Sequence, residues 1–101
     1  MIILERLVQK VRPDKWAALE KIEKKYNAIE SRFGFPAKKR YQCLVGGHDT
    51  NTIIIERQWE SMAVMEATYE KIMADPQYQK LGPETIAAIE SNQIEYFTLL
   101  P

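Results

Sequence analysis

Apolar and polar positions along the chain predict four strands and two main helices. Residues 2–11 combine strong β-forming residues with charged ones, and Arg12-Pro13-Asp14 ends that strand. An amphipathic helix of about 20 residues is expected next, beginning near Pro13 and ending at Gly34. Its apolar stripe has spacings of three and four and consists of Trp16, Leu19, Ile22, Tyr26, Ile29 and Phe33. The charged residues assigned to its opposite side are Glu20, Lys21, Glu23, Lys24 and Lys25.

The second half of the chain predicts a hairpin, a broken helical region and a last strand. Residues 38–46 and 53–59 are the expected hairpin strands, and a turn-rich segment joins them. Ser61 is a good N-cap for a helix whose stripe is Met62, Met65, Tyr69, Ile72 and Met73. Asp75-Pro76 interrupts this helix, which continues briefly to Leu81, and Gly82-Pro83 begins another short helix that runs to about Glu90. Asn92 ends that helix, and residues 94–100 form the last strand.

This order of elements predicts a single ferredoxin-like domain that covers residues 1–101. The order is strand, helix, strand, strand, helix, strand, with one or two additional helical turns. Right-handed crossovers convert that order into a four-stranded antiparallel sheet with both main helices on one face. The expected fold class is therefore α+β.

Several predicted strands carry apolar residues on both faces, which predicts a second cover for the sheet. Ile53, Ile54 and Ile55 are consecutive, and so are Ile2, Ile3 and Leu4. A sheet with one face in water should alternate between apolar and polar residues. We therefore expect a homodimer that pairs the open faces of two sheets about a two-fold axis. The alternative is a monomer with some exposed isoleucines, because much of any protein surface is apolar.

Composition excludes several classes of partner. Fourteen basic and fourteen acidic residues give a formal net charge of zero, so no nucleic-acid partner is expected. The apolar runs are too short to span a bilayer, so no membrane partner is expected either. Cys43 is the single cysteine, which favours a reducing, cytoplasmic location. We expect that thiol to be buried and inert.

Two segments of the chain resemble a known superfamily. The segment from Ile53 to Ala63, with Glu66-Ala67 after it, resembles the third strand and second helix of the dimeric α/β barrel superfamily. That superfamily includes the antibiotic-biosynthesis-type monooxygenases and the NIPSNAP-like proteins. The segment from Ala74 to Leu81 is similar to the end of the second helix in NIPSNAP-like members. The resemblance implies a dimeric barrel with a pocket between sheet and helices or inside the barrel.

The resemblance implies a pocket role for Trp59, with departures at neighbouring positions. In the oxygenase branch a tryptophan at the end of the third strand lines the pocket, and Trp59 is the matching residue. That branch often has a glutamate two residues earlier, where this chain has Arg57, and a helical histidine where this chain has Thr68. These departures weaken the case for an oxygenase or a haem-degrading function in this chain.

The candidate substrate-binding residues are Arg57, Trp59, Tyr41 and Tyr96. Arg57 and Trp59 share a strand face, so Arg57 could hold an anionic or phenolate substrate while Trp59 stacks on its ring. The alternative is that Arg57 forms an ion pair and Trp59 packs beneath a helix. His48, the single histidine, lies in a glycine-rich turn and is expected to be solvated. No metal or cofactor motif is present, so neither is expected.

Two functions are therefore compatible with a small-molecule pocket in this chain. The first is an enzyme without metal or organic cofactor, such as a monooxygenase that deprotonates an activated aromatic substrate. The second is a non-catalytic dimeric binding or interaction protein. A base within reach of the pocket would distinguish the two, and the sequence does not clearly supply one.

Overall fold

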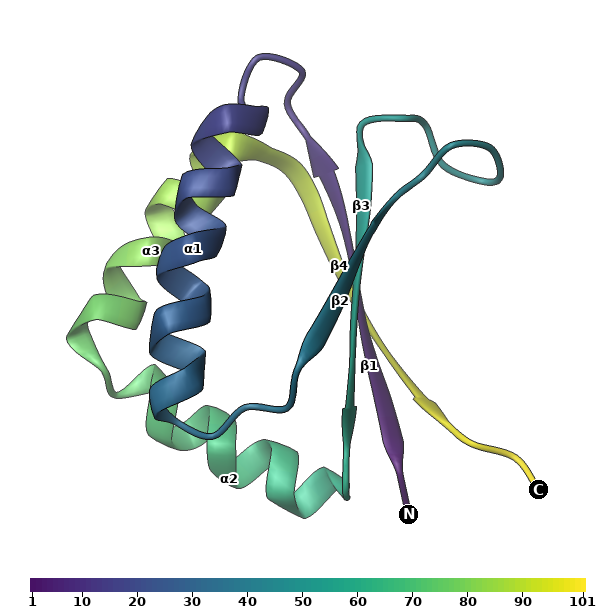
Figure 1. Cartoon of the computed structure of the whole chain (residues 1–101), viewed down its shortest axis with the longest axis vertical. Coiled ribbons are helices and arrows are strands. Elements are labelled where there is room, and N and C mark those ends of the chain that lie inside the picture. Colours follow the sequence, from purple (N-terminus) through teal and green to yellow (C-terminus); the bar gives the residue numbers. More distant parts are fainter.

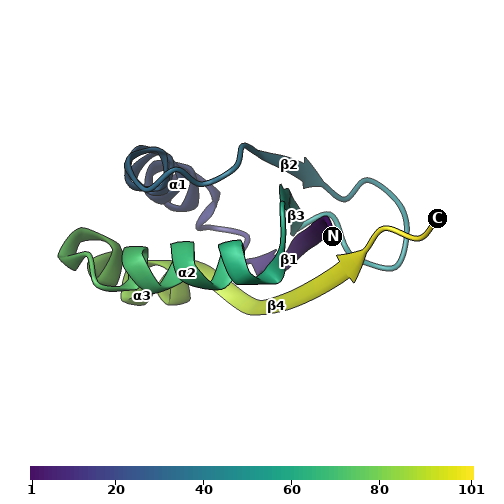
Figure 2. The ribbon, with the colours of Figure 1, turned by 90° about the horizontal axis from the view of Figure 1, so that it is seen from below.

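The computed structural model describes all 101 residues, and it confirms the ferredoxin-like α+β fold (Figure 1). Its elements are β1 (Ile3–Val11), α1 (Trp16–Arg32), β2 (Lys38–Gln42), β3 (Thr52–Trp59), α2 (Met62–Met73), α3 (Pro76–Ala88) and β4 (Ile89–Thr98). The four strands form one antiparallel sheet in the order β2-β3-β1-β4. All three helices lie on one side of that sheet, and its other side is uncovered (Figure 2). None of the helices has the length and apolarity that crossing a membrane requires.

Local capping explains where the helices after β3 begin. Ser61 precedes α2, and its hydroxyl accepts a hydrogen bond from the Val64 amide at 3.2 Å, as expected. The Asp75 carboxylate caps α3 by accepting the amides of Gln77 and Tyr78 at 2.8 and 3.1 Å. The predicted start of α1 at Pro13 is wrong, because residues 12–15 form a turn and the helix begins at Trp16.

The break predicted at Gly82-Pro83 is also wrong, because α3 passes through it as one helix of 13 residues. Pro83 removes one backbone donor, but Leu81 and Ala88 on either side are buried in the core and hold the segment against it. The predicted start of the last strand is late as well. β4 begins at Ile89, directly after α3, and pairs with β1 along its whole length.

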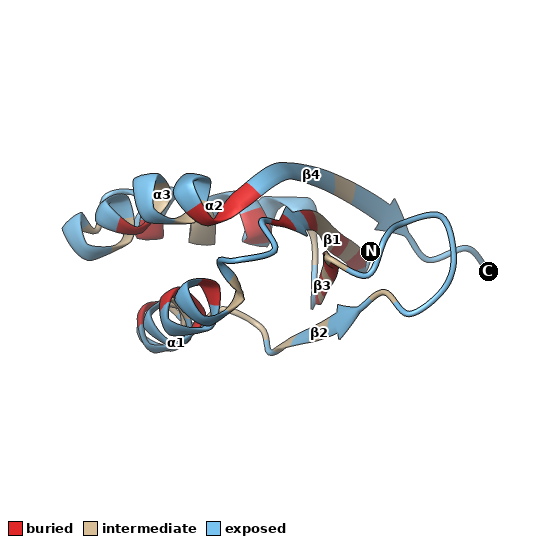
Figure 3. Cartoon of the chain, turned by 90° about the horizontal axis from the view of Figure 1, so that it is seen from above, coloured by how far each residue is buried: buried red, intermediate tan, exposed pale blue.

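Packing of the helices against the odd-numbered residues of β1 and β3 forms the main core. Buried residues are concentrated where the helices approach the sheet (Figure 3). The predicted α1 stripe is confirmed, whereas Met62 and Met73 of the α2 stripe are exposed. The cluster consists of Val11, Leu19, Ile22, Ile29, Ile53, Ile55, Ile72, Leu81, Ala88 and Ile89.

The even-numbered residues of β1 and β3 and the odd-numbered residues of β2 and β4 form the uncovered face of the sheet. We call this the open face and define it by Leu4, Val8, Ile54 and Phe97, with Tyr41 beside Ile54 on β2. One ion pair also lies there, between Arg6 Nε and Glu56 Oε2 at 2.8 Å. The predicted strand at 38–46 is shorter than expected. β2 ends at Gln42, and Leu44 and Val45 extend into solvent in the hairpin loop.

Candidate functional site

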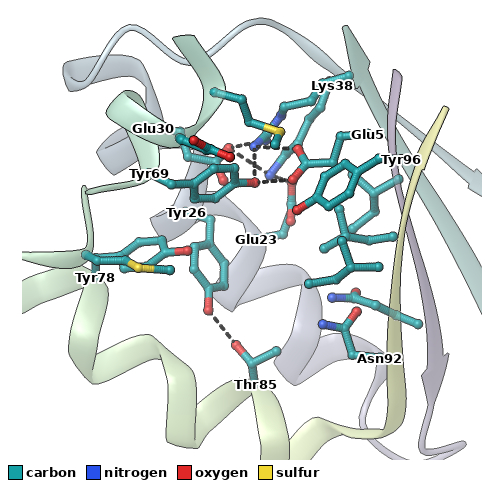
Figure 4. A pocket seen from close by; sticks show the side chains of 18 of the residues that line it. Glu5, Glu23, Tyr26, Glu30, Lys38, Tyr69, Tyr78, Thr85, Asn92 and Tyr96 are labelled. Atoms are coloured by element: carbon teal, nitrogen blue, oxygen red, sulfur yellow. Dashed lines mark hydrogen bonds and ion pairs between the residues drawn. The ribbon is translucent and has the colours of Figure 1, made fainter. Parts of the chain in front are cut away.

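A cavity of about 550 Å³ lies between the sheet and the helices. Residues from three of the strands and from all three helices line it, together with Lys38 at the start of β2 (Figure 4). Small-molecule sites in proteins typically have volumes of roughly 300–1,000 Å³. The cavity is therefore large enough for a small organic ligand.

The register of the sheet arranges the cavity floor in three bands. Lys38, Arg57, Glu5 and Tyr96 lie side by side across all four strands and form a charged row. The next row, two residues further along the strands, consists of Arg40, Ile55, Leu7 and Ile94. All of its members except Arg40 are apolar. The next row toward the hairpin carries Gln42, Ile53, Gln9 and Asn92, with two carboxamides on β1 and β4. The floor thus changes from ionic to apolar to hydrogen-bonding along β1.

A network of ion pairs connects the charged row to α1. Lys38 and Arg57 are cross-strand neighbours of like charge, and Glu30 of α1 lies between them. Glu30 Oε1 is 3.1 Å from Lys38 Nζ and 2.8 Å from Arg57 Nη2. Lys38 Nζ also lies 2.6 Å from Glu23 Oε1. Both cations are therefore neutralised within the protein, because buried like charges are tolerated only when they are paired.

Glu5 is the most deeply buried carboxylate of this network, with 2% of its surface exposed. Its Oε2 accepts a hydrogen bond from the Tyr69 hydroxyl at 2.6 Å, and its Oε1 accepts one from Trp59 Nε1 at 3.2 Å. Arg57 Nη1 lies 3.8 Å from Glu5 Oε1 and donates to the Tyr69 hydroxyl at 3.4 Å. Phe35 packs edge-on against both Trp59 and Tyr69. Trp59, Tyr69 and Phe35 together hold the Glu5 carboxylate at the cavity wall.

The cavity tyrosines remain neutral phenols at ordinary pH. Burial raises the pKa of Tyr69 far above its usual value, and the negative charge of Glu5 and the hydrogen bond to it raise it further. Burial also raises the pKa of Tyr78 to about 12. The pKa of Tyr26 is raised mainly by burial, although its hydroxyl shares a 2.9 Å hydrogen bond with Thr85. These groups therefore donate hydrogen bonds and do not supply negative charge.

Two carboxylates without an ion-pair partner stand at one side of the cavity. Glu66 and Glu70 lie one turn apart on α2, both exposed, and both contribute to the lining. Like charges at this spacing destabilise a helix by roughly 0.2–0.5 kcal/mol. The pKa of Tyr96 is raised first by burial, then by the charge of Glu5 and then by that of Glu66, so Glu66 lies near that phenol. The charged end of the cavity thus has uncompensated negative charge.

The opposite end of the cavity contains an amide without a partner in the protein. Gln9 is 8% exposed as a whole residue, but its amide atoms are accessible, and they make no hydrogen bond within the protein. Asn92, its cross-strand neighbour on β4, lines the same end and also makes no side-chain hydrogen bond. This end is therefore suited to hydrogen bonding with a ligand.

The structure separates the four residues predicted to bind substrate. Arg57 and Tyr96 line the cavity, 6% and 47% exposed respectively. Trp59 shares the face of Arg57 but is fully covered, does not line the cavity and supports Glu5. Tyr41 lies on the open face, on the opposite side of the sheet from the cavity. The alternative roles stated for Arg57 and Trp59, an ion pair and packing beneath a helix, are what the structure contains.

Five network residues were not identified as such from the sequence. Glu5 and Lys38 point toward the helices but look like ordinary charged residues in mixed strands. Glu23, assigned to the solvent side of α1, is buried at 8% exposure and faces the sheet. A signal was available, because Glu23 and Glu30 follow Leu19 and Tyr26 by four residues and therefore lie on the apolar stripe. Tyr69, placed correctly on the α2 stripe, could not be linked to Glu5 without the fold.

The remaining chemical candidates lie outside the cavity. His48 is exposed in the hairpin loop, as expected. The prediction of a buried Cys43 is wrong, because that residue is partly exposed at the end of β2. Its thiol donates a hydrogen bond to the His48 carbonyl at 3.3 Å. Its backbone amide still donates to the Thr52 carbonyl at 3.0 Å, and strand alternation places its side chain on the same side as Tyr41, the face that no helix covers.

The fold is shared with solved structures whose sequences differ widely from this one. A NIPSNAP family protein from Agrobacterium tumefaciens superimposes with a TM-score of 0.82, at 20% identity, over 100% of this chain and 93% of that chain. An uncharacterized NIPSNAP domain protein from Burkholderia xenovorans gives a TM-score of 0.82, at 16% identity, over 97% and 94% of the two chains. This chain has the NIPSNAP-type fold. An antibiotic biosynthesis monooxygenase also matches, with a TM-score of 0.60 at 12% identity over the full length of both chains.

These matches confirm the protomer fold that the resemblance implied. No protein-family profile and no curated protein sequence matches the chain. At identities of 12–20% the shared architecture does not transfer a ligand or a reaction. The function has to be argued from the cavity itself.

Proposed function

We propose that this NIPSNAP-type protein binds a small organic molecule in the cavity between its sheet and helices, and that it does so as a homodimer. The observation that carries the binding proposal is the 550 Å³ cavity with an apolar middle band, in which the accessible Gln9 amide has no partner in the protein. An apolar space with a few convergent polar groups is the usual form of a ligand site. A bound ligand would complete the hydrogen bonding of Gln9.

Binding is tested with the neutral fluorescent probe N-phenyl-1-naphthylamine, whose emission rises in apolar surroundings. Ile94→Trp places a larger side chain in the cavity from an exposed position on β4, so the fold should tolerate it. The matched control is Ile86→Trp on α3, which is 71% exposed and does not line the cavity. We expect saturable binding to the parent and to Ile86→Trp, and at least tenfold weaker binding to Ile94→Trp. Equal binding by both variants would place the probe elsewhere.

The dimer proposal is supported by the accessible area of the isolated chain. The chain exposes 6753 Å², whereas a monomer of 11.8 kDa is expected to expose about 5,900 Å². The difference is close to the roughly 800 Å² that each partner contributes to a standard interface. The open face, with Leu4, Ile54 and Phe97, is the uncovered apolar surface of the sheet. Pairing this face with itself leaves the cavity on the outer side of each sheet.

Sedimentation of matched variants tests the dimer. Ile54→Lys introduces a charge at the centre of the open face, where Val8 and Tyr41 are its cross-strand neighbours. Ile86→Lys makes the same change on the outer side of α3. At micromolar concentration the parent and Ile86→Lys should sediment at twice 11.8 kDa, and Ile54→Lys as the monomer. A parent protein that sediments only at 11.8 kDa contradicts the proposal.

A second candidate function, an enzyme that abstracts a proton without a cofactor, is favoured by one observation. Glu5 supplies the carboxylate base in the cavity wall that the sequence did not reveal. Arg57 and Lys38, however, are already committed to carboxylates, so a substrate anion would find no free counter-charge. This ranks binding ahead of proton abstraction. Deuterium exchange from solvent into a panel of carbon acids, catalysed by the parent and absent in Glu5→Gln, would reverse that ranking.

A further inference from the structure

Resting on the proposed small-molecule function, we infer that the cavity selects an organic cation, with its positive group at the end lined by Glu5, Glu66 and Glu70. The lining contains five carboxylate residues and two cationic ones. The carboxylates are Glu5, Glu23, Glu30, Glu66 and Glu70, and the cations are Lys38 and Arg57. Arg40, outside the lining, lies 3.8 Å from Glu23 and balances part of this charge, so the excess rests mainly on Glu66 and Glu70. Their negative charge repels anions and attracts cations.

The ion pairs inside the cavity leave no cation available for an anionic ligand. Arg57 contacts Glu30 at 2.8 Å and Glu5 at 3.8 Å, and Lys38 contacts Glu23 and Glu30 at 2.6 and 3.1 Å. An anion that approached Arg57 would have to displace a carboxylate already in place. Breaking a buried pair of this kind leaves an uncompensated charge and costs about 3–5 kcal/mol.

The two α2 carboxylates point to the position of the positive group. Glu66 and Glu70 have no ion-pair partner, and they are a repelling pair one helical turn apart. Tyr96, whose phenol is close enough to Glu66 to be perturbed by it, adds an aromatic ring at the same end. A cation bound here would relieve the repulsion between the carboxylates and contact the face of a ring.

The bands of the floor describe the rest of the ligand. Glu5 and Gln9 are four residues apart on β1, which separates their rows by about 13 Å at the usual strand rise. Leu7, Ile55 and Ile94 make the middle band apolar. The partnerless amide of Gln9 then takes a hydrogen-bonding group at the far end. The ligand class is therefore an elongated amine with an apolar body and a polar group at its other end.

Three matched probes test this class by displacement of N-phenyl-1-naphthylamine at pH 7. They are 4-(4-hydroxyphenyl)butylamine, 4-(4-hydroxyphenyl)butan-1-ol and 4-(4-hydroxyphenyl)butanoic acid, which share one body and carry positive, zero and negative charge. We expect the amine to bind most tightly and the acid most weakly. Glu66→Gln/Glu70→Gln should weaken amine binding on the order of tenfold and leave alcohol binding unchanged, because exposed charge pairs contribute up to about 1 kcal/mol each.

A second double variant controls for net charge alone. Asp14→Asn/Glu60→Gln removes the same two charges from exposed positions that do not line the cavity. It should bind the amine as the parent does. Acid binding as tight as amine binding, an unchanged preference in Glu66→Gln/Glu70→Gln, or displacement by none of the three probes would each overturn the inference. The proposed function fails separately, when the fluorescent probe itself is insensitive to Ile94→Trp.

Discussion

Replacement of Arg57 by methionine tests how strongly the buried network depends on its central cation. The side chain of Arg57 is 5% exposed and contacts Glu30, Glu5 and the Tyr69 hydroxyl. Methionine matches much of its length but carries no charge, so Glu5 and Glu30 would keep their burial and lose their shared partner. Removing one member of a buried pair costs about 3–5 kcal/mol. That is a large part of the roughly 5–15 kcal/mol expected for a domain of this size.

The matched control is Arg32→Met at the end of α1. Arg32 donates to Gln77 at 2.9 Å and lies 3.5 Å from Asp75, but its side chain is 55% exposed. An exposed pair of this kind contributes about 0–1 kcal/mol. Urea unfolding at pH 7 and equal protomer concentration, followed by the fluorescence of Trp16 and Trp59, measures both free energies of unfolding. If Arg57→Met loses no more than Arg32→Met, the network does not contribute to stability as argued.

Three further predictions concern the cavity and the helix cap. Gln9→Leu should change the free energy of unfolding of the unliganded protein by no more than about 0.5 kcal/mol, because the accessible amide that it removes bonds to no other residue; a clearly larger loss in urea unfolding would refute this. The raised pKa of Tyr78 keeps the folded form protonated above pH 10, where the unfolded form ionises, so stability should fall between pH 10 and about 12. Tyr78→Phe should lessen that fall in urea midpoints measured across this range, and an unchanged slope would contradict the assignment. Asp75→Ala should cost about 1 kcal/mol in thermal unfolding through loss of the α3 cap, whereas Asp14→Ala, in the turn before α1, should cost much less; equal losses would refute the capping role.

Periodicity was sufficient to predict the elements and the sheet. The α1 stripe and the two capping residues Ser61 and Asp75 agree with the structure because each depends on local spacing. The predicted helix break at Gly82-Pro83 was wrong because burial of the neighbouring side chains outweighs the cost of a proline inside a helix. The start of β4 was predicted too late because pairing with β1 overrides the weak strand tendency of the first residues of β4.

The candidate site was harder to predict because it depends on which strand face meets the helices. In β1 the odd positions carry Glu5 and Gln9 among apolar residues, and the even positions carry Arg6 and Lys10 among others. The alternation of residue types along β1 therefore did not show whether the odd or the even positions are buried. Contacts such as Glu5 with Tyr69 join residues 64 positions apart and exist only in the folded chain. Arg57, a candidate from the sequence, lines the cavity, but its ion pairs could not be seen in advance.

A crystal structure of the protein with 4-(4-hydroxyphenyl)butylamine bound would examine the cavity most directly. We predict the ligand between sheet and helices, with its ammonium group within hydrogen-bond distance of a Glu66 or Glu70 carboxylate. Its hydroxyl should lie near the Gln9 amide. A ligand bound on the open face, between two paired sheets, or anywhere outside the cavity would contradict the proposed site.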